Sequence, residues 1–363
     1  MIKNRVRNIF NKLKKPTDII IIKNSDYPYI DNNFFYFTGI KNGLFEGSIL
    51  ILYPDGNMDI VMSTLEVESA KKSIANLLVY KNRKEYNEIM KTSIAPFKNI
   101  GLNYLGISLL DFFKFQELFP KSNFYDISNE LQKVRLVKDR YELKNIKKAC
   151  VIADQIVEKI PELLNEGVYE YEIAAEIDYS MQKLGAEKPA FETICSFDVN
   201  TAEPHYSHGN TKLKKGNFAL FDFGASVNRY NSDITRTFVY KNPSEKQKDI
   251  YETVLKAQKV GLENIKPNKK ACDIHEAVNT CIDKTKYKGR FIHSTGHSIG
   301  LSVHDGGRLS PDSNIILKEN MVFTVEPGIY IPKYGGVRIE DDVLVTKDGY
   351  ELLTKTPKTF LEL

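Results

Sequence analysis

The chain has 363 residues, of which 42% are hydrophobic, and its 51 basic residues nearly balance its 47 acidic ones. That length is enough for about two domains and a substantial core. Because charges of both signs are mixed along the chain without a long block of either, a nucleic-acid-binding surface is not expected.

Residues 1–15 predict an amphipathic helix. Ile2, Val6, Ile9 and Leu13 recur at helical spacing and no continuous apolar run follows, so a signal peptide is not expected. No segment reaches the roughly 18 to 20 apolar residues that span a bilayer. The four cysteines lack CxxC spacing and are typical of reduced thiols. We therefore expect a cytoplasmic protein with no membrane partner.

The first half alternates short apolar runs with helical stretches, which is typical of an α/β domain. The runs DIIIIK, FFYFTGI, SILILY and MDIVM precede the helix-like EVESAKKSIANL, and NIGLNY and SNFYDIS follow. SILILY and MDIVM flank Pro54-Asp55-Gly56-Asn57, which predicts a hairpin because Gly and Asn tolerate a positive φ. We place this N-terminal α/β domain at residues 1–128.

A long amphipathic helical stretch with a break near Lys138-Asp139 opens a second domain, residues 129–363. This domain predicts a repeat of architecture rather than of sequence. In each half, two helices precede two strands that carry acids; the expected helices are 140–165, 170–184, 244–264 and 272–285. The overall class is therefore α/β (α+β), with a pseudo-two-fold αα-ββ repeat in the second domain.

Five potential metal ligands stand in apolar or glycine-bearing segments of this domain: Asp222, Asp233, His297, Glu326 and Glu340. Burying an ionised carboxylate without compensation costs several kcal/mol or more, so a shared cation best explains acids embedded in such strands. Four carboxylates and one imidazole suit manganese, cobalt, iron or zinc. Two such cations can activate a water for amide or ester hydrolysis. No GxSxG, Cys/His or phosphate-loop signature offers a competing nucleophile.

The histidines refine this hypothesis, because five of the six lie in two short stretches of the second domain. Glycines on both sides of His297 allow close backbone approach and favour it as a ligand. His304 and His205 have no ligand-type carboxylate beside them, so we expect them to contact substrate. His208 and His293 remain open between supporting and structural roles, and His275 is interpreted as an ordinary helix histidine.

The segments DFGA, YNSDITRTF, TGHSIGLSVHD, VEPGIY and GVRIEDD resemble the motifs of the pita-bread metallopeptidases, the family of aminopeptidase P, prolidase and methionine aminopeptidase. This resemblance extends over residues 130–363. It implies that Asp222 binds one metal, that Asp233 and Glu340 bridge both, and that His297 and Glu326 bind the other. It also implies that Glu326 is the general base. His304 would steady the substrate carbonyl, and His205 and Arg338 would lie toward the residue after the scissile bond.

The N-terminal half narrows the choice within that family. FFYFTGI and LILYPDG resemble the N-terminal domain of prolidase, aminopeptidase P and creatinase, which methionine aminopeptidases usually lack. The expected function is dinuclear, manganese- or cobalt-dependent hydrolysis of Xaa-Pro dipeptides by a homodimer. The alternatives are an Xaa-Pro aminopeptidase acting on longer peptides, a methionine aminopeptidase-like hydrolase and a non-enzymatic scaffold. We expect Arg338 to pair with the free carboxylate of a dipeptide.

Overall fold

The computed structural model describes residues 1–359 and divides the chain into two units, Met1–Val134 and Arg135–Leu363. The division falls inside helix α6 (Ser128–Leu136), whose first residue adjoins the boundary expected at 128. A mixed α/β class is confirmed for the chain. Among the described residues, no helix is both long and apolar enough to cross a membrane.

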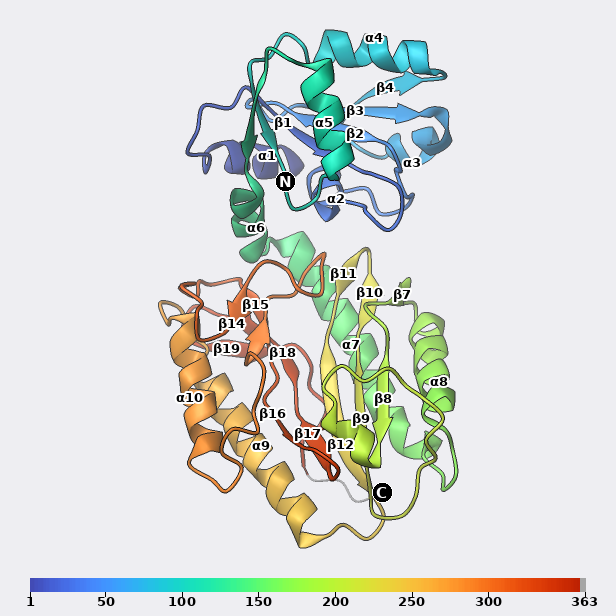
Figure 1. Ribbon diagram of the computed structural model, residues 1–363, viewed down its shortest axis with the longest axis vertical. Helices are drawn as coiled ribbons and strands as arrows, with labels where there is room; N and C mark the ends of the chain where they lie inside the picture. The colour runs from blue at the N-terminus through green and yellow to red at the C-terminus, as the bar shows by residue number, and fades with distance from the viewer. Residues whose placement is uncertain (360–363) are drawn as a thin grey trace. The chain divides into compact units, whose positions relative to one another are not determined.

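The N-terminal unit is built on a six-stranded sheet with the order β4-β3-β2-β1-β5-β6, in which only β2 runs against the others. The buried isoleucines of this sheet form one hydrophobic core with side chains of helices α4 and α5, which are neighbours in Figure 1. The strands are β1 (Ile19–Lys23), β2 (Ile49–Leu52), β3 (Met58–Ser63), β4 (Asn76–Tyr80), β5 (Asn99–Leu102) and β6 (Asn123–Asp126). The helices before α6 are α1 (Ile2–Phe10), α2 (Asn32–Thr38), α3 (Val67–Ala70), α4 (Arg83–Ser93) and α5 (Leu109–Leu118).

The amphipathic first helix and the predicted β2–β3 hairpin are confirmed, but two other expectations for this unit were wrong. FFYFTGI is helical rather than strand-like, because the Asp31 side chain caps α2 and Gly39 ends it at φ +69°. Within EVESAKKSIANL, which begins where the turn η1 (Thr64–Glu66) ends, only the single turn α3 is α-helical, and the chain then extends into β4. A helix this short gains little from propensity, and pairing of β4 with β3 decides the conformation.

The second unit repeats a pair of helices followed by strands. In the first half α7 (Arg140–Leu163) and α8 (Glu170–Lys183) pack on strands β8 (Ile194–Phe197), β9 (Asn217–Phe223) and β12 (Ile234–Tyr240). The expected break at Lys138-Asp139 is confirmed, since Asp139 forms a capping box at the start of α7. Shorter elements complete this half: β7 (Lys188–Pro189), η2 (Asp198–Ala202), β10 (Ala225–Val227) and β11 (Tyr230–Asn231).

In the second half α9 (Glu245–Asn264) and α10 (Ala271–Asp283) pack on the strands that follow them, and Figure 1 shows the strands of both halves between the two helix pairs. These strands are β13 (Gly296–His297), β14 (Arg308–Leu309), β15 (Val322–Val325), β16 (Gly328–Ile331), β17 (Gly335–Arg338), β18 (Asp341–Val345) and β19 (Tyr350–Leu352). All four expected helices of this unit are present within two residues of their predicted bounds. The halves join where Thr237 Oγ1 donates to the Arg338 carbonyl at 2.9 Å.

Candidate metal centre

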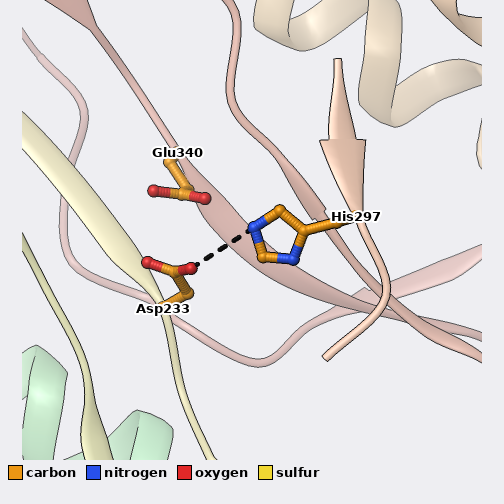
Figure 2. A group of neighbouring side chains, drawn as sticks. All are labelled: Asp233, His297 and Glu340. Carbon is orange, nitrogen blue, oxygen red and sulfur yellow. Dashed lines mark ion pairs between the residues drawn. The ribbon is translucent and has the colours of Figure 1, made fainter. Parts of the chain in front are cut away.

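Three buried side chains converge at the seam between the two halves. Asp233, His297 and Glu340 each offer a ligand atom, and these atoms lie within 4.8 Å of one another (Figure 2). The Nε2 atom of His297 is 3.5 Å from Asp233 Oδ2 and 3.5 Å from Glu326 Oε1. Asp222 and Glu326 line the same cavity of about 810 Å³ as these three residues. The structure therefore brings all five residues singled out as ligands to one cavity.

The backbone positions of the acids differ in part from the expectation that each lies within a strand. Only Asp222 lies inside one, β9. Asp233 directly precedes β12, Glu326 directly follows β15, and Glu340 lies in the two-residue link between β17 and β18. Positions at strand ends free the carboxylates from strict alternation between sheet faces, so that they can turn toward a common point.

Glycine at position 296 allows His297 to approach the acids. A Cβ atom at Gly296 would lie 1.9 Å from the Thr324 carbonyl oxygen, so any larger residue would push β13 away from β15. The His297 amide donates to Thr324 Oγ1 at 3.1 Å, and that hydroxyl donates to Glu326 Oε1 at 3.2 Å. One threonine thus connects the backbone of the histidine to the side chain of the glutamate.

The positive charge of Arg338, which pairs with Asp222, does not compensate the burial of the other three acids. Burial, together with Glu340 and Asp222, raises the pKa of Asp233 well above its usual value. Burial, together with Glu326 and Asp222, does the same to the pKa of Glu340. The pKa of Glu326 rises to about 7, mainly through burial, and Arg338 only partly opposes the shift. Each carboxylate raises the pKa of its neighbours and so favours their neutral form. A cation shared by these carboxylates would lower the pKa values again, so the group is suited to bind one.

The hydrogen bonds identify which carboxylate oxygens remain available. Among residues 1–359, neither Asp222 Oδ1 nor Asp233 Oδ1 has a hydrogen-bond partner, although both atoms are buried. The other Asp222 oxygen accepts from Arg338 at 2.5 Å, and Glu340 Oε2 accepts from Thr235 Oγ1 at 2.6 Å. A buried carboxylate oxygen without a donor is costly, so the donor set fits divalent cations.

Two further histidines expected to contact substrate lie at the same cavity. The rings of His304 and His297 meet edge to face with centroids 4.2 Å apart. His304 is exposed overall, yet partial burial and the nearby Arg308 lower its pKa, so its ring is neutral at neutral pH. His205 is exposed and also lines the cavity. Both can therefore reach a bound molecule.

The other histidines divide differently from the sequence interpretation. His275, interpreted as an ordinary helix residue, lines the cavity and packs on Phe291, as does His293. Burial and Arg338 lower the pKa of His293 to about 4. His208 instead hydrogen bonds through Nδ1 to the Thr193 carbonyl at 3.0 Å. The spacing of residues in the sequence does not distinguish His275 from a surface helix residue. The packing of α9 and α10 is what brings it to the cavity.

Two of the arginines near the site, Arg338 and Arg308, have unequal exposure. Arg338 is 2% exposed, and its guanidinium donates to Asp222, to Tyr330 at 2.9 Å and to Thr235 at 3.1 Å. It does not line the cavity, so its expected contact with a substrate carboxylate is replaced here by contacts within the protein. Arg308 is exposed at the cavity, and within residues 1–359 its guanidinium makes no ion pair. The sequence interpretation missed Arg308, which the structure pairs with His297 across β13 and β14, a pairing that no pattern in the sequence indicates.

Comparison with known proteins agrees with this geometry. Residues 144–347 match the model of metallopeptidase family M24, and residues 4–137 match the creatinase/prolidase N-terminal domain. A protein named Xaa-Pro dipeptidase from Pyrococcus furiosus is 40% identical over 335 residues, covering 91% of this chain and 92% of that one. The chain belongs to metallopeptidase family M24.

Comparison with solved structures supports membership of family M24 over nearly the whole chain. The prolidase from Pyrococcus horikoshii matches with a TM-score of 0.90 and 34% identity over 99% of both chains. The X-Pro aminopeptidase from Thermotoga maritima matches with a TM-score of 0.89 and 30% identity, covering 96% of this chain and 98% of that one. The expected fold, a creatinase/prolidase-type domain followed by a pita-bread domain, is confirmed, and the protein is a metallopeptidase that binds divalent metal.

Proposed function

We propose that this M24 peptidase hydrolyses the amide bond between an N-terminal residue and proline, with the Xaa-Pro dipeptide as its substrate. The observation that carries the proposal is one cavity lined by four acids and His297, in a chain whose relatives are named Xaa-Pro dipeptidase and prolidase. An Xaa-Pro amide has no N–H, so it cannot be gripped by strand pairing and needs a shaped pocket instead. Apolar side chains that include Phe191, Ile194 and Phe291 line this cavity and offer surface for a proline ring.

Asp222, Asp233, His297, Glu326 and Glu340 are the proposed ligands of two divalent cations, with manganese or cobalt foremost and zinc or iron as alternatives. The mutual distances, the unpartnered buried oxygens and the raised carboxylate pKa values support this set. When bound, such a pair supplies Lewis acidity that activates water and offsets negative charge on the scissile carbonyl. Arg338 holds Asp222 in place from behind through its short ion pair.

Glu326 is the proposed general base. It lines the cavity with its Oε1 3.5 Å from His297 Nε2, so its carboxylate lies beside the proposed metal ligands, where it can accept a proton from the activated water. A neutral His304 can donate an N–H to the scissile carbonyl as that oxygen gains charge. His205, exposed at the same cavity, would contact the proline residue after the scissile bond.

Arg308 is the proposed partner of the free carboxylate of a dipeptide. It is the exposed arginine at the cavity, and a charge-assisted contact of this kind contributes about 1.5 to 3 kcal/mol. A peptide that continues beyond proline places no carboxylate at this point. The match to the X-Pro aminopeptidase of Thermotoga maritima keeps cleavage of longer peptides as a second candidate function.

Rates on Ala-Pro, Ala-Pro-Ala and Met-Ala-Ala, measured with saturating manganese or cobalt, test the proposal. We expect kcat/KM to be highest for Ala-Pro and lowest for Met-Ala-Ala. Preference for the tripeptide Ala-Pro-Ala would instead select the aminopeptidase, and fastest cleavage of Met-Ala-Ala would refute the proline specificity.

The role of Arg308 is tested with Ala-Pro and its C-terminal amide. Arg308→Met should lower kcat/KM for Ala-Pro by about tenfold or more and change the rate on the amide much less. Arg290→Met is the matched control, because Arg290 is exposed in the same unit and does not line the cavity. Equal losses on both substrates would show that Arg308 does not bind the carboxylate.

A further inference from the structure

The segment that carries His205 has little apolar anchoring. It connects β8 to β9, and after η2 no residue between Thr201 and Leu213 is buried. Segments with few buried apolar contacts open easily unless polar contacts hold them. The question is therefore which contacts fix the position of His205.

A buried carboxylate at the start of α8 makes four of those contacts. Glu170 is 0% exposed, and its Oε1 accepts from the Phe197 amide at 2.7 Å and from Asn200 Nδ2 at 2.9 Å. Its Oε2 accepts from the Tyr206 hydroxyl at 3.0 Å and from the Gly209 amide at 3.0 Å. Two donors precede His205 in the chain and two follow it, so one side chain gathers both arms of the segment.

The backbone at the start of α8 adds to this attachment. The Glu170 amide donates to the Thr211 carbonyl at 3.2 Å, and the Tyr171 amide donates to the Gly209 carbonyl at 3.3 Å. Amides in the first turn of a helix have no partner within the helix, so they are available to hold a neighbouring segment. These backbone bonds lie only on the C-terminal arm, whereas the Glu170 carboxylate reaches both arms.

We propose that Glu170 is a positioning residue for His205: its carboxylate ties Asn200 and Tyr206 together and so holds the histidine at the cavity. Glu170 itself does not line the cavity and acts only through the segment. The inference rests on the proposed function in that His205 contacts the proline side of the substrate. Because both Glu170 oxygens act solely as acceptors, substitution by an acceptor–donor group must break the arrangement.

Glu170→Gln tests this directly. The amide keeps the size of the side chain, yet its NH₂ group faces two donors in either orientation. We expect hydrogen exchange of amides in residues 202–210 to rise about tenfold and kcat/KM for Ala-Pro to fall about tenfold to a hundredfold, with metal content retained. Glu172→Gln is the matched control, because Glu172 lies in the same helical turn and is exposed, and within residues 1–359 its carboxylate bonds only the Tyr169 amide.

A double-substitution cycle separates positioning from general loss of structure. If Glu170 acts through His205, Glu170→Gln should cost nothing further in a chain that already carries His205→Ala. Tyr206→Phe removes one of the four donors, so it should raise hydrogen exchange and lower kcat/KM in the same way but by less. It serves as the test variant if Glu170→Gln does not fold.

Additive losses in the cycle, unchanged exchange in residues 202–210, or exchange that rises uniformly over the second unit would overturn the positioning role. Hydrogen exchange needs no substrate. If the wild-type chain did not cleave Ala-Pro, the proposed function would fail while the attachment of the segment by Glu170 would still be measured.

Discussion

Loading the metal centre should release protons, and the number released can be worked out from the metal-free site. A raised carboxylate pKa means that the folded metal-free chain holds protons that the unfolded chain has lost. Its stability is therefore present at low pH and is lost as the pH rises through the folded pKa. Cations expel these protons, so the stability that metal adds should grow with pH over the same interval.

Between pH 6.5 and 8, the acids of the site account for the pH dependence of the stability that metal adds. The pKa values of His297 and His293 are lowered to about 3 and about 4, so both rings are neutral there in the folded chain. Protons bound by the unfolded chain are the same with and without metal and cancel from the metal-dependent difference. Over this interval Glu326, with a pKa of about 7, contributes about 1 kcal/mol to the metal-dependent difference in unfolding free energy. Asp233 and Glu340, whose pKa values burial and the neighbouring acids also raise, change this difference in the same direction.

Titration calorimetry of manganese into metal-free protein, in two buffers of different ionisation enthalpy, counts the protons directly. At pH 7 we expect about half a proton from Glu326 and further release from Asp233 and Glu340. Glu326→Gln should lower the count by about half a proton, because a group with a pKa of about 7 is half protonated at that pH. Binding without proton release, or with a count that the substitution leaves unchanged, would refute the assignment of these acids as ligands.

Three other substitutions test separate parts of the site. Asp233→Asn should lower the amount of bound metal, measured by metal analysis, and should lower kcat by about a hundredfold or more. Two tightly bound metal equivalents with normal turnover would contradict the role of Asp233 as a ligand. His304→Ala should keep both metals and lose most of kcat, whereas metal loss would make His304 a ligand. Gly296→Ala should lower the free energy of unfolding, measured in urea, by about 3 kcal/mol or more, because the added Cβ meets the Thr324 carbonyl. A Tm within about 1 °C of wild type would show instead that β13 can shift freely.

The sequence alone determined the order of elements in the second unit and the identity of the acids. Helical periodicity predicted α7 to α10, since amphipathic faces more than ten residues long leave a repeating pattern. Acids within runs such as FALFDFGA stood out because an apolar strand gives a carboxylate no local partner. Short apolar runs carried less information, and FFYFTGI was misassigned because its length fits a strand and a helix equally well.

Only the tertiary structure decided which side chains meet across long distances in the sequence. Arg338 was expected at the substrate, but the packing of β17 beside β12 buries it next to Asp222, and Arg308 lies exposed at the cavity. His275 reaches the cavity through the packing of α10, which no local pattern records. Charge and hydrophobicity along a chain indicate which residues need partners, whereas the choice of partner depends on strand register and helix packing, which arise from contacts summed over the whole unit.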